Sequence, residues 1–436
     1  MPQPTNPFLI SASTASLTVG KGELLGSCRT ALGGTPPAFV FRVPGRVEVL
    51  GKHTDYAGGR SITCAIDRGF IVAVRPRSDS HVLAYACDLQ QSVGFDLIGD
   101  MPVRSSGWQN YVQSVARRLA GNFGQPLHGV DMAFASDLPQ ASGMSSSSAL
   151  VVATYLALNA ANDFNQREAF RQNISCEEDL AGYLGACENG MRFGTLAGDT
   201  GVGTFGGSED HTAILLSQPG HLGLYTYAPV RCERMIAWPA DMALLIATSG
   251  VRAEKTAAAR EKYNRIALLM RAIMEVLRAN GWDKSTLASA IGDDPHAATC
   301  VAEILGKTHH RTYSPGELQE RFWQFAQEHQ VIIPQAANAI AAENWAALGT
   351  LVDQSQMLAE TALHNQIPQT TYLAHAARKI GAVAASAFGA GFGGSVWAMA
   401  PRHAAADFLQ QWRQDYAAHF PTEARRAQFF ATSPSR

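Results

Sequence analysis

The chain has 436 residues, 46% of them hydrophobic, so it is long enough to bury one large core or two. Its 35 basic and 37 acidic residues give a formal net charge of −2, which argues against broad nucleic-acid binding and against an anionic-membrane surface. The sequence contains neither a membrane-spanning apolar run nor a basic segment leading an apolar core, so we expect no membrane span and no secretory signal.

The seven cysteines are scattered and include no Cys-x-x-Cys pair. An odd number of separated cysteines is typical of reduced thiols, and it favours neither a disulfide framework nor a zinc site. We therefore expect a globular cytoplasmic protein.

In the first half of the chain, short β-branched runs alternate with turn sequences, and patterns typical of helices follow them. Strands are predicted at 39–43, 61–66, 70–76, 81–89 and 129–139. Apolar residues at helical spacing predict a helix at 108–123, closed by Gly124. A second helix follows the Gly-Ser stretch at 142–148, and because it is apolar on nearly all sides we expect it to be buried.

The second half is mostly helical. A helix is predicted at 176–191, and the glycine-rich segment 194–216 is expected to lead into a strand. Beyond a strand at 242–250, long helical patterns occupy 257–277, 317–340 and 345–363, and 381–401 returns to strand, glycine loop and strand. The shift in composition places a domain boundary near 235, giving domains 1–235 and 236–436.

The segment Gly45–Gly59, "GRVEVLGKHTDYAGG", places an arginine, a lysine, a histidine and an aspartate between turn-forming glycines. Two interpretations are open from these residues alone. The segment is either a strand and a solvated turn, or the wall of a pocket for a small ligand with many hydroxyls.

A second segment, Ser142–Ala149 ("SGMSSSSA"), directly precedes the buried helix. Small residues at a helix N-terminus let backbone N–H groups converge on a phosphate, and hydroxyls can reach a phosphate-bound Mg²⁺. The alternative is a serine-rich helix cap without a ligand. No Gly-Lys-Ser/Thr follows, so the segment is not a Walker A loop.

Two further glycine loops complete the set. "GAGFGG" at 389–394 matches a dinucleotide-binding string, but a strand is predicted after it where that motif needs a helix, so a close backbone approach is the better interpretation. In "GTFGGSEDHT", Glu209 and Asp210 either form the turn or provide a general base. Phosphate-binding loops beside an isolated carboxylate indicate phosphoryl transfer to a hydroxyl.

The stretches 44–59, 138–153 and 388–396 resemble, in this order, the three motifs of the GHMP small-molecule kinases. The first stretch and the segment led by Trp108 are similar to the galactokinase branch, and the likeness runs from about Phe41 to Ala400. The resemblance implies a two-domain α+β GHMP kinase fold with the active site in the cleft between the domains. It also implies ATP and Mg²⁺ as cofactors, a small-molecule sugar as substrate, and a monomer or weak homodimer.

The resemblance also implies a role for each matching residue. Asp210 matches the catalytic aspartate that receives or orients the proton of the anomeric hydroxyl, and Arg46 matches the arginine beside the transferring phosphoryl group. The implied sugar contacts are Lys52, His53, Asp55, Gly207 and Tyr263; the implied ATP contacts are Trp108, Gly143, Ser145, Ser146, Ser147 and Ser148; the implied Mg²⁺ ligands are Ser146 or Ser147 with Glu188.

The chain departs from the galactokinase pattern on its sugar side. Lys52 stands where galactokinases usually have a glutamate that accepts from the sugar's 6-hydroxyl, so we expect a sugar with an anionic group at C6, such as galacturonate or a 6-phosphorylated sugar or cyclitol. If Lys52 turns away, an ordinary galactokinase for neutral galactose remains. His211 replaces the usual glutamine, and the spacing from Glu188 to Asp210 is longer than in the family.

Three other interpretations stay open from the sequence. They are a sensor that binds sugar and ATP without turnover, a kinase for a non-sugar alcohol such as mevalonate or homoserine, and a metal site formed by His53 and Asp55.

Overall fold

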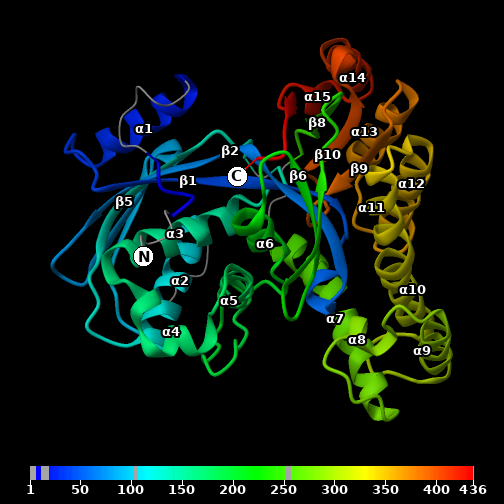
Figure 1. Ribbon diagram of the computed structural model, residues 1–436, viewed down its shortest axis with the longest axis horizontal. Coiled ribbons are helices and arrows are strands. Elements are labelled where there is room, and N and C mark those ends of the chain that lie inside the picture. Colours follow the sequence, from blue (N-terminus) through cyan, green and yellow to red (C-terminus); the bar gives the residue numbers. More distant parts are fainter. Residues whose placement is uncertain (1–5, 11–18, 103–106, 141, 252–256, 436) are drawn as a thin grey trace. The chain divides into compact units, whose positions relative to one another are not determined.

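The structure is a computed structural model of the chain (Figure 1), and it describes residues 6–10, 19–102, 107–140, 142–251 and 257–435. These residues form two compact units. The first unit comprises Met1–Gly45, Arg68–Leu138 and Ser146–Gly203, and the second comprises Arg46–Asp67, Pro139–Ser145 and Thr204–Arg436. This division differs from the single boundary expected near 235, because two early segments of the chain belong to the second unit and position 235 lies within one of its strands.

Two long strands, β1 (Phe39–Leu50) and β2 (Arg60–Pro76), contribute residues to both units. In the first unit, β2 pairs antiparallel with β5, β5 pairs parallel with β3, and β3 pairs antiparallel with β4. The other elements of this unit are α1 (Val19–Ala31), β3 (His81–Ala86), β4 (Gln91–Asp96), α2 (Trp108–Phe123), β5 (Val130–Ser136), α3 (Ser146–Asn162), α4 (Glu168–Asn173) and α5 (Glu177–Asn189).

The second unit contains an antiparallel sheet in the order β11-β8-β10-β9, and its β6 pairs with β7 and with the start of β2. Its strands are β6 (His221–Thr226), β7 (Arg231–Ala237), β8 (Met242–Thr248), β9 (Ala384–Phe388), β10 (Ser395–Pro401) and β11 (Phe429–Thr432). Its helices are α6 (Glu209–Leu216), α7 (Ala257–Ala279), α8 (Leu287–Ile291), α9 (Pro295–Lys307), α10 (Pro315–Ala326), the π-helix η5 (Gln327–Ile332), α11 (Ile333–Ala341), α12 (Trp345–Thr361), α13 (Pro368–Lys379), α14 (Ala405–His419) and α15 (Pro421–Ala424).

Most of the predicted elements are confirmed. The helix at 108–123 ends at Gly124, the helix after the serine stretch is buried along most of its length, and 384–401 is strand, glycine loop, strand. Two predictions were wrong. The strands expected at 61–66 and 70–76 form one continuous strand, β2, and the strand expected at the end of 194–216 is the helix α6. Glu209 and Asp210 lie in the first turn of α6, where acidic side chains favour a helix.

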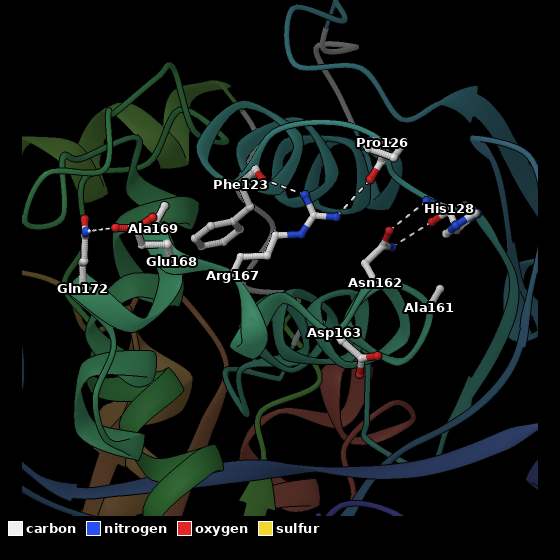
Figure 2. Close-up of a pocket in the computed structure, with 10 residues that line it drawn as sticks. All are labelled: Phe123, Pro126, His128, Ala161, Asn162, Asp163, Arg167, Glu168, Ala169 and Gln172. Carbon is white, nitrogen blue, oxygen red and sulfur yellow. Dashed lines mark hydrogen bonds between the residues drawn. The ribbon is translucent and has the colours of Figure 1, made fainter.

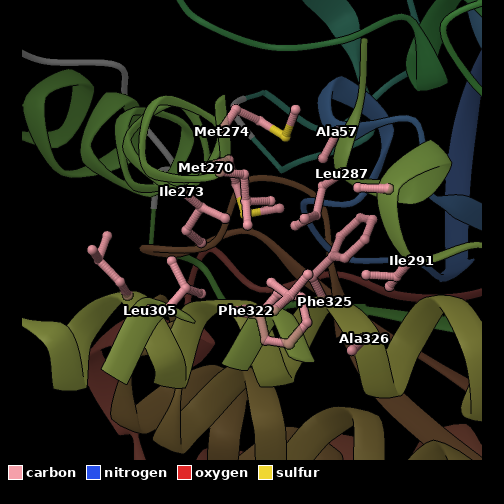
Figure 3. Close-up of a cluster of buried hydrophobic side chains, with 14 of the residues drawn as sticks. Ala57, Met270, Ile273, Met274, Leu287, Ile291, Leu305, Phe322, Phe325 and Ala326 are labelled. Carbon is pink, nitrogen blue, oxygen red and sulfur yellow. The ribbon is translucent and has the colours of Figure 1, made fainter. Parts of the chain in front are cut away.

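A hydrophobic cluster of α7–α10 supports one turn of the second unit. Figure 3 shows Met270, Ile273, Leu287 and Phe325 of this cluster, with Ala57 packed against them. Ala57 belongs to the short 3₁₀ turn Asp55–Ala57, so the burial of this residue anchors the polar turn that precedes it.

No described helix is long and apolar enough to cross a membrane.

Candidate active site

An ion pair between Arg46 and Asp210 lies in the second unit. Both Nε and Nη2 of Arg46 lie 2.7 Å from Oδ1 of Asp210, and Nη1 donates to the Gly143 carbonyl at 2.5 Å. Arg46 is buried, whereas 31% of the Asp210 side chain is exposed. The arginine therefore holds a partly open carboxylate at a fixed distance from the 142–145 loop.

The charge state of Asp210 follows from these contacts. Burial raises the pKa of the Asp210 carboxyl, but the charge of Arg46 and the hydrogen bonds from Ser145 and Arg46 together outweigh burial, so the net pKa lies below the usual value. Asp210 is therefore ionised at neutral pH and can accept a hydrogen bond or a proton.

The turn that follows β1 places Asp55 against Gly207 and Glu209, which directly precede Asp210. Oδ2 of Asp55 accepts from the Glu209 N–H at 3.1 Å, and Oδ1 accepts from the Tyr56 N–H at 2.8 Å. A Cβ at Gly207 would lie 2.2 Å from Oδ2 of Asp55, so only glycine allows this approach. The structure thus brings together Asp55 and Gly207, which were predicted separately.

Several carboxyl groups of this region are harder to ionise than Asp210. Burial raises the pKa of Asp55 to about 6, and the neighbouring charge of Asp210 raises it as well. Burial also raises the pKa of Glu48 to about 7 and the pKa of Glu209 well above its usual value. The site therefore contains one carboxylate with a lowered pKa beside three carboxyl groups with raised pKa values. Such a spread of pKa values is typical of sites that perform acid–base catalysis.

His53 is a neutral side chain with both ring nitrogens engaged. Burial and the nearby Arg321 lower its pKa to about 3. Nε2 lies 3.3 Å from the Ala390 carbonyl, which can only accept, so Nε2 carries the proton and Nδ1 accepts from the Tyr56 hydroxyl at 3.2 Å. Because both nitrogens are used, the geometry does not favour the metal pair of His53 and Asp55. The Tyr263 ring lies 5.4 Å from the His53 ring, centroid to centroid.

Lys52 does not project toward the ion pair. Its side chain is 1% exposed, and Nζ donates to Ser386 Oγ at 2.8 Å and to Ser355 Oγ at 3.3 Å. The expectation that Lys52 contacts the sugar therefore lacks geometric support, because the ammonium is committed to groups of β9 and α12.

The two glycine loops of the second unit pack on one another. A Cβ at Gly389 would lie 2.9 Å from the Gly143 carbonyl, and Ser395 Oγ donates to the Ser142 carbonyl at 2.6 Å. Gly143 and Ser145 both have positive φ, at 77° and 58°. The close backbone approach expected for 389–394 is confirmed, and it shapes the loop that carries Gly143 and Ser145.

The other predicted phosphate and metal residues lie in the first unit. Ser146 begins helix α3, and Ser146 and Ser147 are half-buried. Ser148 is buried and its Oγ donates to Oε2 of Glu188 at 2.8 Å. Glu188 was predicted to act with Ser146 or Ser147, whereas its hydrogen-bonded serine in the structure is Ser148.

Trp108 opens helix α2 and is half-buried in the first unit. Its Nε1 donates to Gln91 Oε1 at 3.1 Å, and its ring meets Phe134 edge-on with centroids 5.3 Å apart. Both contacts restrict the orientation of the Trp108 ring.

Three sequence families match separate parts of the chain. The galactokinase galactose-binding signature matches residues 29–76, the GHMP kinases N terminal domain matches 110–192, and the GHMP kinases C terminal domain matches 336–418. A galactokinase from Roseiflexus sp. (strain RS-1) is 29% identical over 389 residues, which is 88% of each chain. The chain belongs to the GHMP kinase family. Within it, the chain is a galactokinase-like sugar kinase.

Further comparisons agree with this membership. A galactokinase from Chloroflexus aurantiacus is 32% identical to the sugar kinase over 219 residues, about half of each chain (50% and 51%). The Lactococcus lactis galactokinase complexed with galactose superposes with a TM-score of 0.74 at 22% identity, covering 91% of this chain and 93% of that one. A mevalonate kinase superposes less well, with a TM-score of 0.55 at 16% identity. The expected α+β GHMP kinase architecture with N- and C-terminal domains is confirmed.

Sequence reasoning missed two buried residues of the sugar kinase. Glu48 lies four residues before Lys52 and carries one of the raised pKa values, and Arg321 of α10 donates to the His53 carbonyl at 2.6 Å. Glu48 carried a signal, since a glutamate within the apolar run of β1 is unusual. Arg321 carried none, because "ELQERFWQ" has the pattern of an ordinary amphipathic helix.

A separate hollow of about 870 Å³ in the first unit involves none of the predicted site residues. Figure 2 shows Arg167 bonded to the carbonyls of Phe123 and Pro126, and Asn162 bonded to the backbone of His128. The side chains of Arg167 and Asn162 already form hydrogen bonds within the protein, so we assign neither of them a role in binding a ligand in this hollow.

Proposed function

We propose that this sugar kinase transfers the γ-phosphoryl group of ATP to the anomeric C1 hydroxyl of a galactose-type sugar. The observation that carries this proposal is the ion pair of Arg46 with a partly exposed, ionised Asp210, in the same unit as Asp55, His53 and the 142–145 loop. The match of residues 29–76 to the galactose-binding signature supports the choice of sugar.

The proposed role of Asp210 is to orient the C1 hydroxyl and receive its proton as the oxygen attacks. Phosphoryl transfer depends mostly on positioning and charge stabilisation, so a single aligned carboxylate suffices. Arg46 keeps Asp210 ionised and presents positive charge where negative charge develops on the transferring group.

The first unit offers groups suited to Mg²⁺ and ATP. Mg²⁺ prefers oxygen ligands, and the Ser148 hydroxyl and Glu188 carboxylate form a buried pair of them, with Ser146 and Ser147 at the start of the same helix. When bound, Mg²⁺ neutralises phosphate charge. We propose that Ser146, Ser147 and Ser148 contact the phosphates and that Trp108 stacks on the adenine. Gly143 and Ser145, which belong to the second unit, are proposed as phosphate contacts from the same resemblance.

The sugar is proposed to be neutral at C6. The case for galacturonate rested on an ammonium facing C6, whereas Nζ of Lys52 is committed to Ser386 and Ser355.

The test is an ADP-release assay with ATP and Mg²⁺ across galactose, glucose, galacturonate, mevalonate and homoserine, with the product identified by ³¹P NMR. We expect turnover of galactose to the 1-phosphate and at least about tenfold lower kcat/KM for galacturonate, a difference of about 1.4 kcal/mol. Preference for galacturonate restores the anionic-sugar hypothesis. Sugar-dependent thermal stabilisation without turnover would indicate a sensor.

A further inference from the structure

The ammonium of Lys52 lies at the centre of a directional hydrogen-bond network in the second unit. An ammonium only donates, so Ser386 and Ser355 accept from Nζ and must pass their own protons onward. The Ser355 hydroxyl donates to Oε1 of Glu328, and the Ser386 hydroxyl donates to Oε1 of Gln356 at 2.9 Å. Every hydroxyl proton in this network therefore has a fixed direction.

The orientation of the Gln356 amide is also fixed. Its Oε1 accepts from the Ala387 N–H at 2.9 Å, and a backbone N–H can only donate. Its Nε2 donates to Glu360 at 2.8 Å. The network thus joins Lys52, two residues after the end of β1, to β9, α12 and η5 through groups whose hydrogen-bond directions are fixed.

The charges of the network compensate one another. Lys52 and Glu328 are both buried; burial raises the pKa of Glu328, and the charge of Lys52 and the hydrogen bond from Ser355 oppose this rise without cancelling it. Lys52 lowers the pKa of Glu48 in the same way. Removing one partner of such a pair leaves an uncompensated buried charge, whereas removing both leaves none.

The same backbone segment is held from its other side by α10. Gln324 Nε2 donates to the Lys52 carbonyl at 3.3 Å, and Arg321 Nη2 donates to the His53 carbonyl at 2.6 Å and to the Tyr56 hydroxyl at 3.1 Å. Hydrogen bonds therefore hold both the side chain and the carbonyl group of Lys52. They restrict the backbone conformation of the residues from Lys52 to Asp55.

We propose that Lys52 is a positioning residue whose ammonium, balanced by Glu328 through Ser355 and held by Ser386, fixes the turn that presents His53 and Asp55 to the sugar. This inference rests on the proposed function and deepens it, because it makes the affinity for the sugar depend on a charge pair that does not touch the sugar.

The test is a double-mutant cycle of Lys52→Met and Glu328→Gln with galactose and ATP as substrates. Each single variant is expected to raise the KM for galactose about tenfold or more, while the KM for ATP stays within about threefold of the wild-type value. The double variant removes both charges but also every hydrogen bond of Nζ, so its KM for galactose is expected to rise by clearly less than the product of the two single effects. The ratio of kcat/KM for galactose over galacturonate is expected to stay unchanged in all three.

Two outcomes overturn the proposal. If Lys52 touches the sugar, Lys52→Met changes the ratio of galactose to galacturonate, Glu328→Gln has no effect on KM, and the double variant behaves like Lys52→Met. If the pair only stabilises the fold, the variants lower Tm and the active fraction but leave the KM for galactose unchanged. A wild-type enzyme that phosphorylates no sugar refutes the proposed function itself, which separates that failure from these two.

A matched control and a milder variant complete the experiment. Lys307 and Glu303 form an exposed pair on α9 with 3.6 Å between their charged atoms, and Lys307→Met with Glu303→Gln should leave both KM values unchanged. Ser386→Ala removes the 2.8 Å acceptor of Lys52 but keeps both charges, so it should fold and raise the KM for galactose a few-fold. No change in Ser386→Ala counts against the positioning role.

Discussion

At the scale of single residues, the carboxylate of Asp210 has one property that its buried neighbours lack, a pKa below its usual value. We expect Asp210→Asn to lower kcat by roughly 10²–10⁴, the range typical of losing a general base, because the amide keeps the shape but accepts no proton. The KM values for galactose and ATP should stay within a few-fold. Steady-state kinetics measures both; near-normal turnover would assign the proton to another carboxyl, with Glu209 the first to test.

Arg46 makes three contacts that one ammonium cannot reproduce, two to Asp210 Oδ1 and one to the Gly143 carbonyl. Arg46→Lys keeps the charge, yet we expect kcat to fall at least about tenfold, a loss of about 1.4 kcal/mol. The acidic limb of the kcat–pH profile should also move to higher pH, because a weaker contact lowers the pKa of Asp210 less.

The control for this substitution is Arg77→Lys in an exposed ion pair with Asp79, which should leave kcat and the pH profile unchanged. An Arg46→Lys variant with wild-type kcat and an unmoved acidic limb would make Arg46 a purely structural residue.

Sequence reasoning was most reliable in grouping residues that the structure places close together. Asp55 and Gly207, predicted as separate sugar contacts, meet in the structure, and Tyr263 reaches the His53 ring. It was least reliable for the direction of a long side chain. The side chain of Lys52 has four rotatable bonds, and its acceptors Ser355 and Ser386 lie 303 and 334 residues further along the chain. No local sequence pattern therefore indicates where its ammonium points.

At the scale of elements, Gly207 in the segment before α6 allows that segment to lie close to the turn that carries Asp55 and Tyr56. A Cβ at Gly207 would lie 2.2 Å from Asp55 Oδ2 and 2.8 Å from the Tyr56 nitrogen. We expect Gly207→Ala to displace the Asp55 turn and to raise the KM for galactose about tenfold or more, while the KM for ATP changes little. Initial-rate kinetics with each substrate varied in turn measures this split.

Gly26→Ala is the matched control for this change. Gly26 lies within helix α1, and a Cβ there would have no atom within 4 Å, so alanine should leave both KM values unchanged and keep or raise Tm. Equal KM values in Gly207→Ala and the wild type would show that the turn accommodates the methyl group, contrary to the expectation.

The elements themselves were predictable where one local signal dominated. Strand, glycine loop and strand at 384–401 followed from β-branched and aromatic residues around glycines, and α3 followed from an apolar run after a serine stretch. The strand β2 was divided in the prediction because Asp67 and Arg68 resemble a turn, whereas pairing with β6 and β5 keeps the backbone extended across them. Tertiary pairing of this kind overrides local propensity.

At the scale of the whole molecule, buried groups with shifted pKa values set how stability depends on pH. His53 and His329 have pKa values lowered to about 3 and about 4, so the folded state binds fewer protons than the unfolded state below pH 6.5. Their contribution to stability is complete above pH 6.5 and is lost as pH falls. Asp55 and Glu48, with pKa values raised to about 6 and about 7, act in the opposite direction. Between pH 4 and 6.5 the two effects oppose one another.

Glu48 separates these effects, because its pKa rises from 4.5 in the unfolded chain to about 7 in the fold. The folded state therefore holds this proton more tightly, and stability falls as pH rises from 4.5 to 7. Glu48→Gln has no ionisation to oppose, so its Tm relative to wild type should be higher at pH 8.5 than at pH 5.5, and its relative stability should differ between the two pH values by at most about 2 kcal/mol. Thermal unfolding at both pH values measures this, with the exposed Glu303→Gln as the control. A Tm difference that does not grow with pH would mean that Lys52 and Arg46 keep Glu48 ionised at no net cost.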